Sequence, residues 1–235
     1  MSFLKQSCIV LFFVASIVVG SASALCSKAS LTGVWGYQVG TAVGQFTADG
    51  NGNITKGSQV VHHKGTIQTQ TFTGTYLVAS TCTGSLTLKF TGNVTVTANF
   101  VLDNGNKGAQ IIDTTPGEFA EGIGVAEGAT CGLTGTFAAL LLGKSGTSPI
   151  AYVAQVILDG KGKVSGTGTF DVGGAVHNTP FTGSYAETSN CNGTIQMKPT
   201  GVGTLNFFFV VVNAGKELLL VEIDPSASVA GNMQR

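Results

Sequence analysis

Apolar and polar residues alternate along most of the chain after about residue 30, and breaks containing Gly or Asn interrupt the alternation at short intervals. Thr and Val, which favour strands, are abundant in these segments, and none of them has the 3.6-residue period of an amphipathic helix. The pattern predicts an all-β protein. In the first half of the chain we expect strands over 31–39, 42–48, 53–61, 66–78, 84–90, 94–101, 107–113 and 119–126.

Eight short strands in sequence suit an antiparallel up-and-down meander. An open meander leaves two unpaired edges, and closing the sheet into a barrel removes both of them. We therefore expect a β-barrel of about eight strands, and a two-sheet β-sandwich is the alternative architecture.

Four short segments occur twice in the same order, which indicates a tandem duplication. The segments 31–35, 49–54, 72–76 and 82–86 return as 133–137, 159–164, 181–185 and 191–195. The copies meet near residues 128–130 without a Pro- or Ser-rich linker, so we expect the two units to pack against each other. The predicted domains are a first barrel repeat over 25–128 and a second over 129–235.

The first 24 residues have the features of an export signal. Lys5 precedes an apolar run over 8–19, and Ala22-Ser23-Ala24 provides small residues at the cleavage positions. We predict a signal peptide over 1–24, a mature chain with no membrane span, and a secreted location that is either extracellular or in the periplasm and cell envelope.

Loss of the signal peptide would remove Cys8 and leave an even set of cysteines: Cys26, Cys82, Cys131 and Cys191. Paired cysteines in an exported chain predict disulfides. Four cysteines allow three connectivities. Because each copy has one cysteine before its first strand and one after its Phe-Thr-Gly-x-Tyr segment, the duplication favours Cys26–Cys82 and Cys131–Cys191.

The second copy has continuous apolar runs over 140–142, 207–212 and 218–221 where the first copy alternates. Strands that are apolar on both faces are usually buried on both. The outer face of the second unit is therefore expected to be covered by the first unit or by another subunit. If it remains exposed, it should drive self-association through the second repeat.

The 12 basic and 12 acidic residues cancel, and only 10% of the chain is charged. There is no basic stripe with interleaved aromatic residues, so nucleic acid is not a predicted partner. The partners compatible with this composition are an unidentified protein or a small lipophilic molecule.

Few residues suggest chemistry. His62, His63 and His177 all fall near the connection between the third and fourth strands of a copy. A His-His pair can ligate a metal or transfer protons, but no carboxylate or free cysteine lies close in sequence to complete such a site. We interpret the histidines as solvated loop residues and predict no catalytic residue, metal site or cofactor.

Asp49 and Asp159 begin matching Asp-Gly-x-Gly turns, which invites comparison with calcium-binding loops. Such a loop needs further oxygen ligands and a bidentate Glu, and Ile54 and Thr55 cannot supply this set. A hairpin turn of type I′ explains the same residues.

Four aromatic residues are the remaining candidates for a ligand site: Trp35, Tyr37, Phe72 and Tyr76. An eight-strand barrel either fills its interior with side chains or keeps a cavity. These aromatics would line such a cavity, with His62 and His63 near its mouth, and packing in the core is the alternative interpretation.

Several segments resemble repeat units of uncharacterised secreted bacterial proteins: Leu-Thr-Gly-x-Trp/Phe, Phe-Thr-Ala-Asp-Gly-Asn-Gly-Asn-Ile-Thr at 46–55, Phe-Thr-Gly-Thr-Tyr at 72–76 and Gly-Asn-Met-Gln at 231–234. The resemblance covers the whole mature chain. It implies export and a repeated β unit, but it brings no established activity and therefore no catalytic residues. The strand count also gives an analogy with calycin and allene-oxide-cyclase barrels.

Three functions follow as hypotheses. The first is a non-enzymatic interaction or structural module outside the cell, because the scaffold is duplicated, poor in charge and without a reactive set of residues. The alternative is a carrier that holds a small lipophilic molecule inside a barrel. The least supported is an enzyme that uses His62 and His63 at a barrel mouth.

Overall fold

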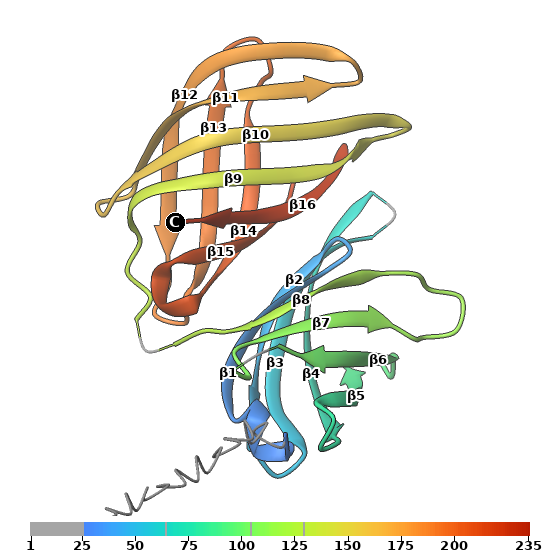
Figure 1. Ribbon diagram of the computed structural model, residues 1–235. Helices are drawn as coiled ribbons and strands as arrows, with labels where there is room; N and C mark the ends of the chain where they lie inside the picture. Colours follow the sequence, from blue (N-terminus) through green and yellow to red (C-terminus); the bar gives the residue numbers. More distant parts are fainter. Residues whose placement is uncertain (1–25, 64, 104, 129) are drawn as a thin grey trace, which may run out of the picture.

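The computed structural model describes residues 26–63, 65–103, 105–128 and 130–235. The predicted signal peptide lies outside this part of the chain. The described residues form two closed antiparallel barrels of eight strands each (Figure 1). The prediction of two up-and-down barrels is confirmed, and the sandwich alternative is wrong.

In the first barrel, the 3₁₀-helix η1 (Lys28–Leu31) precedes the strands β1 (Gly33–Val39), β2 (Ala42–Ala48), β3 (Asn53–His63), β4 (Thr66–Val78), β5 (Thr83–Phe90), β6 (Thr95–Leu102), β7 (Gly108–Asp113) and β8 (Glu121–Ala126). Each strand pairs with the next, and β8 closes the barrel against β1.

The second barrel consists of β9 (Thr134–Ser145), β10 (Ser148–Asp159), β11 (Lys163–Val172), β12 (Ala175–Glu187), β13 (Asn192–Pro199), β14 (Leu205–Val212), the 3₁₀-helix η2 (Asn213–Gly215), β15 (Glu217–Glu222) and β16 (Ala227–Gln234). It closes through β16 and β9. No helix among the described residues is long and apolar enough to cross a membrane.

In both barrels an interior aromatic ring lies over a glycine on the neighbouring strand. A Cβ atom added at any of these glycines would come within 2.2–2.8 Å of the ring, so no larger residue fits there. The pairs are Phe72 with Gly57, Phe100 with Gly84, Phe181 with Gly166, and Phe209 with Gly193. The repeated Gly and Phe positions in the sequence therefore encode matched contacts across the barrel wall.

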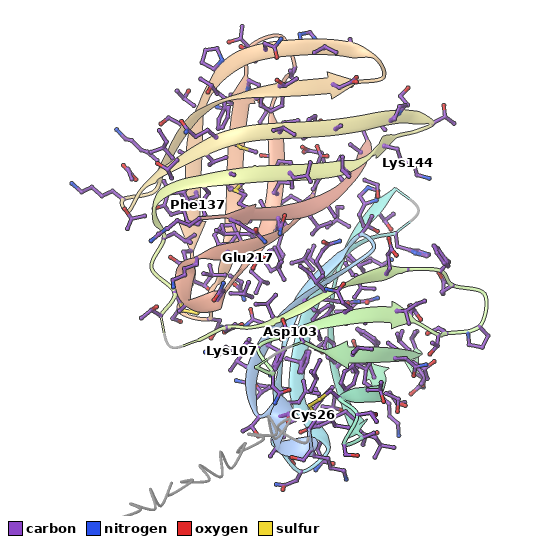
Figure 2. The ribbon with its side chains drawn as sticks, in the orientation of Figure 1. Cys26, Asp103, Lys107, Phe137, Lys144 and Glu217 are labelled. Carbon is purple, nitrogen blue, oxygen red and sulfur yellow. A yellow bond between two sulfur atoms is a disulfide. The ribbon has the colours of Figure 1, made fainter. Side chains whose placement is uncertain are left out.

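Both predicted disulfides are present: Cys26–Cys82 and Cys131–Cys191. Each joins the segment before the first strand of its own barrel to the turn after the fourth strand. Figure 2 labels Cys26 at this end of the first barrel. The matched tyrosines Tyr76 and Tyr185 reinforce these connections, because their hydroxyls donate to main-chain carbonyls in the same N-terminal segments, at 3.0 and 2.8 Å.

The Asp-Gly-x-Gly segments are hairpin connections, as expected, but they are not type I′ turns. Positive φ occurs at Gly50 (76°) and Gly52 (110°) with another residue between them, whereas type I′ needs two consecutive positive φ values. In both copies the Asp Oδ1 accepts backbone N–H groups two and four residues later, at 2.7 and 2.9 Å. Hydrogen bonds, chiefly from the Asn53 side chain, lower the pKa of Asp49 to about 2. The carboxylate therefore organises its own turn.

The outer faces of β14 and β15 pack on the outer faces of β1, β2 and β3. The contact is apolar and at most 8% exposed at its core: Val43, Val60, Val210, Val212, Leu219 and Val221. Gly36 permits the close approach, since a Cβ there would lie 2.4 Å from Val212 Cγ1. The apolar runs 207–212 and 218–221 are thus covered by the first barrel.

The third apolar run, 140–142, differs from expectation. Leu141 points into the second barrel and is 1% exposed, whereas Leu140 and Leu142 remain 49% and 56% exposed on its outer face. Burial therefore alternates along this run as in an ordinary strand, since no described residue covers its outer face. Self-association through this face stays a prediction.

The closing segment 231–234 completes the second barrel. Met233 points inward and is fully buried, while Asn232 and Gln234 both donate side-chain hydrogen bonds of 2.9 Å to Glu217 on β15. Figure 2 labels Glu217, which lies on β15 beside β16. The C-terminal strand is therefore tied to its neighbour by side chains as well as by main-chain pairing.

Candidate functional site

The first barrel contains a cavity of about 470 Å³. It lies at the end that carries the β1–β2, β3–β4, β5–β6 and β7–β8 connections, opposite the end that is closed by the Cys26–Cys82 disulfide. Its size is within the range of small-molecule sites in proteins.

Most of the lining is apolar. The aliphatic walls come from β5, β6 and β7, including Leu86, Leu88 and Ile111. Rings form a second part of the interior: Tyr37 contacts Phe46 and Phe72 with centroid distances of 6.1 and 6.2 Å. An environment of this kind favours a ligand with a largely apolar body.

A hydrogen-bonded pair of polar side chains, Tyr37 and Gln59, faces this interior. The Tyr37 hydroxyl donates to Gln59 Oε1 at 2.6 Å, and Gln59 Nε2 donates to Gln70 Oε1 at 2.8 Å. Burial raises the pKa of Tyr37 above its ordinary value, so the phenol stays neutral. Gly44 makes room for this arrangement, because a Cβ there would lie 2.7 Å from the Tyr37 hydroxyl oxygen. The pair supplies a fixed polar contact for a ligand.

The structure brings several of the predicted site residues to this interior. Tyr37 lines the cavity and His63 lies at its rim. Phe72 packs against the aromatic residues beneath, with its ring 4.9 Å from that of Phe90. Trp35 and Tyr76 line a smaller hollow of about 20 Å³ deeper in the barrel.

His62 lies elsewhere. It is 8% exposed at the junction of the two barrels, where its Nε2 is 3.3 Å from the main-chain oxygen of Pro225. The interpretation of His62 as a solvated loop residue, and its placement at the mouth beside His63, are therefore both wrong. Adjacent residues in a strand point to opposite faces, so His62 and His63 separate. No group of three or more His, Cys, Asp or Glu side chains suited to a metal occurs in the described part of the chain.

Three small residues that sequence reasoning missed border the cavity: Ala42, Val61 and Ala98. The strand registers make them the equivalents of Tyr152, Phe170 and Phe207 in the second barrel. Ala42 pairs with Val61 as Tyr152 pairs with Phe170, and Ala98 occupies the place on its strand that Phe207 occupies on β14. An alignment of the two copies through their repeated segments would have revealed these differences, because smaller residues in the first copy align with aromatic residues in the second.

The second barrel is filled at the corresponding positions. Tyr152, Phe170 and Phe207 are at most 2% exposed, and the rings of Tyr152 and Phe170 lie 5.4 Å apart. Glu222 is buried in the same interior, and burial, with a further contribution from Asp224, raises its pKa to about 8. The three aromatic side chains therefore occupy, in the second barrel, the space that is empty in the first.

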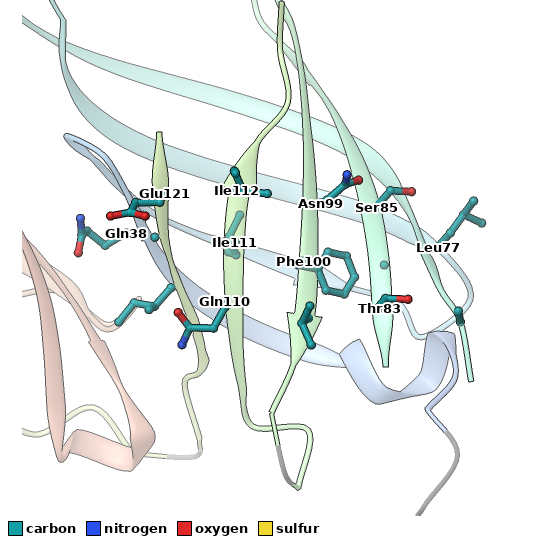
Figure 3. Close-up of a pocket in the computed structure, with 15 residues that line it drawn as sticks. Gln38, Leu77, Thr83, Ser85, Asn99, Phe100, Gln110, Ile111, Ile112 and Glu121 are labelled. Atoms are coloured by element: carbon teal, nitrogen blue, oxygen red, sulfur yellow. The ribbon is translucent and has the colours of Figure 1, made fainter. Parts of the chain in front are cut away.

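A larger but shallower hollow of about 970 Å³ lies on the outer face of the first barrel (Figure 3). Polar residues including Ser85, Asn99 and Gln110 alternate there with Leu77 and Ile112, which are 61% and 48% exposed. This surface is open to solvent and lacks the enclosed apolar walls of the interior cavity, so it is the weaker candidate for a small-molecule site.

The chain matches no protein-family model and no curated protein. The resemblance to secreted bacterial repeat proteins therefore stays a prediction, and the functional argument depends on the geometry of the barrels.

Proposed function

We propose that the protein is an exported carrier that holds a small lipophilic molecule in the cavity of its first barrel. The observation that carries the proposal is the empty space bordered by Ala42, Val61 and Ala98, where the second copy places aromatic rings. A barrel of this size can be filled by its own side chains, as the second barrel demonstrates, so the space is specific to the first copy.

The surroundings support a carrier. The cavity walls are apolar, and the Tyr37–Gln59 pair offers a small number of oriented polar contacts, as is typical of sites for apolar ligands. The second barrel would act as a rigid support, because its β14 and β15 bury the outer face of β1, β2 and β3.

Export is part of the proposal. The two disulfides are consistent with an oxidising compartment outside the cytosol, and the sequence of residues 1–24 has the features of a signal peptide. A carrier in such a compartment would move molecules that dissolve poorly in water.

The test is a titration of the purified mature protein with the fluorescent apolar probe N-phenyl-1-naphthylamine. We expect saturable binding at one site, and we expect Ala98→Phe to weaken it by at least about tenfold because the added ring occupies the cavity. The matched control is Val101→Phe, which adds a ring on the outer face near the shallow hollow. Equal affinity in the wild type and Ala98→Phe, or loss in Val101→Phe alone, would place the probe outside the cavity and refute the proposal.

A second candidate, an interaction module, is favoured by the exposed apolar stripe on β9 and β10. Leu140 pairs with Val153 across these strands, and the two side chains are 49% and 57% exposed. Sedimentation velocity of the wild type and Leu140→Ser would test it: a concentration-dependent dimer that Leu140→Ser abolishes would support association through this face, and a wild-type monomer would exclude self-association there.

A further inference from the structure

Two connections at the rim of the cavity expose large apolar side chains. Phe119, on the β7–β8 connection, is 86% exposed and is the most exposed large apolar residue in the described part of the chain. Val94, on the β5–β6 connection, is 53% exposed. Both residues also line the cavity, so the exposed apolar surface is continuous with its interior.

The β7–β8 connection, which projects from the first barrel in Figure 1, is held by its own hydrogen bonds. Asp113 N donates to Ala120 O at 2.8 Å, and Thr115 N donates to Asp113 Oδ1 at 2.7 Å. The connection is also tied to β6, where Thr97 N donates to Thr115 Oγ1 at 3.0 Å. The loop thus presents Phe119 outward from a fixed base.

An exposed phenylalanine lowers its free energy when it enters an apolar phase. A lipophilic ligand also resides mainly in such a phase, so a carrier that loads it must bring the cavity mouth to that phase. The apolar residues at this rim satisfy both requirements at one place.

The charge of the rim indicates which kind of lipid surface it can contact. Among the described residues that line the cavity, Asp113 and Glu118 carry carboxylates and none is Lys or Arg. Anionic lipids attract basic residues near a membrane surface, and the described lining residues include no Lys or Arg to meet them. The rim is therefore suited to an uncharged or zwitterionic bilayer.

We propose that the mouth of the first barrel docks on a zwitterionic lipid bilayer through Phe119 and Val94, so that the ligand passes between membrane and cavity without crossing water. This inference rests on the carrier function proposed above. It adds a site of contact and a partner, the lipid surface, to the cavity itself.

The test has two measurements on the mature protein. The first is cosedimentation with phosphatidylcholine vesicles, in which Phe119→Ser should bind at least about fivefold more weakly because the apolar ring is lost. Leu77→Ser is the matched control, since Leu77 is 61% exposed on the wall of the same barrel and not at the mouth. Ala98→Phe, which fills the cavity, should still bind vesicles, and this separates docking from ligand uptake.

The second measurement is the stopped-flow rate at which N-phenyl-1-naphthylamine moves from vesicles to the protein. For the wild type, the rate should rise with vesicle concentration, and in Phe119→Ser it should fall by more than any fall in affinity for the probe in solution. Wild-type protein that fails to sediment with vesicles, or a Phe119→Ser rate that falls only as much as the affinity, would overturn docking. Docking is overturned and the carrier function retained if these results accompany normal probe binding, whereas absent probe binding removes the carrier function itself.

Discussion

The two barrels share one strand topology, but their interiors differ. At three matched positions the first barrel has Ala42, Val61 and Ala98, and the second has aromatic side chains that fill the same space. The backbone topology is therefore compatible with both a cavity and a solid core. The choice depends on a few side chains, because eight strands enclose only slightly more volume than their inward residues need.

The duplication offers a physical reason for this division. A cavity costs packing energy, because the atoms that line it lose contacts. In the second barrel Phe207 and Phe209 are fully buried. The outward-facing side chains of β14 and β15 also pack on the outer face of the first barrel. A well-packed second copy can thus support a first copy that keeps an unfilled interior.

The largest expected effect comes from exchanging the interior residues. Phe207→Ala should lower the free energy of unfolding by about 3–5 kcal/mol, because it opens a cavity in a filled core. Ala98→Phe should lower it by less than about 1.5 kcal/mol, because the first barrel has room for the ring. Urea unfolding measures both by far-UV circular dichroism, and the single Trp35 reports separately on the first barrel. Equal losses in the two variants would contradict the difference between the interiors.

We expect the two disulfides to contribute nearly equally to the free energy of unfolding. The bonded cysteines are separated by 56 residues in the first copy and 60 in the second. In the chain-entropy model each bond contributes about 4 kcal/mol, so the Cys26→Ser/Cys82→Ser and Cys131→Ser/Cys191→Ser variants should lose nearly the same stability. Denaturant midpoints of the two double variants provide the comparison, and a loss confined to one of them would show that the copies do not use their bonds equally.

The buried carboxyl groups predict a dependence on pH. The folded-state pKa of Glu222 is raised to about 8, against an ordinary value of 4.5, mainly by burial. The folded state then holds a proton that the unfolded state has lost, so its stabilising effect is complete below about pH 4.5 and disappears as pH rises through about 8. Glu222→Gln should flatten this decline. Thermal unfolding at pH 5, 6.5 and 8 tests it, and an identical slope in the variant would exclude Glu222 as its source.

Glu127 adds to this decline within the same pH range. Burial raises its pKa to about 7, and Lys56 opposes the shift. Glu127→Gln is the matched variant for the same series of pH values, and it should remove the part of the decline that occurs between about pH 4.5 and pH 7.

The smallest expected effect concerns the matched tyrosine hydroxyls. Tyr76 donates to Lys28 O, and Tyr185, its counterpart in the second copy, donates to Leu133 O. Tyr76→Phe and Tyr185→Phe should each cost about 1 kcal/mol, since each removes one hydrogen bond. Equilibrium unfolding in urea resolves changes of this size, and a cost near zero in either variant would show that the hydroxyl adds nothing to the disulfide beside it.

Much of the fold was predictable from local patterns. The eight expected strands of the first copy agree with the observed ones to within two residues at each end, because alternation of polarity and turn residues is a local property of the chain. The disulfide pairing was also predictable, since the duplication placed one cysteine at each end of a repeated segment.

The candidate site was predictable only in part. Tyr37 and His63 were named and do border the cavity, but His62 was assigned to the wrong face. A choice between adjacent residues of a strand depends on a register that is set across the barrel, and a β-bulge in β3 shifts that register between Ile54 and Gly57. The repeated segments reveal one extra residue in the first copy between 54 and 72, but they do not show where β3 accommodates it.

Short-range patterns and the comparison of one copy with the other were enough to place the strands, the duplication and the cysteine pairing. Three features became visible only in the folded molecule: the hollow interior of the first barrel, the burial of β14 and β15 against its outer face, and the exposure of Phe119 at the mouth. Each of these depends on volume or exposure. Such quantities are sums over side chains from many strands, and no single stretch of sequence contains them.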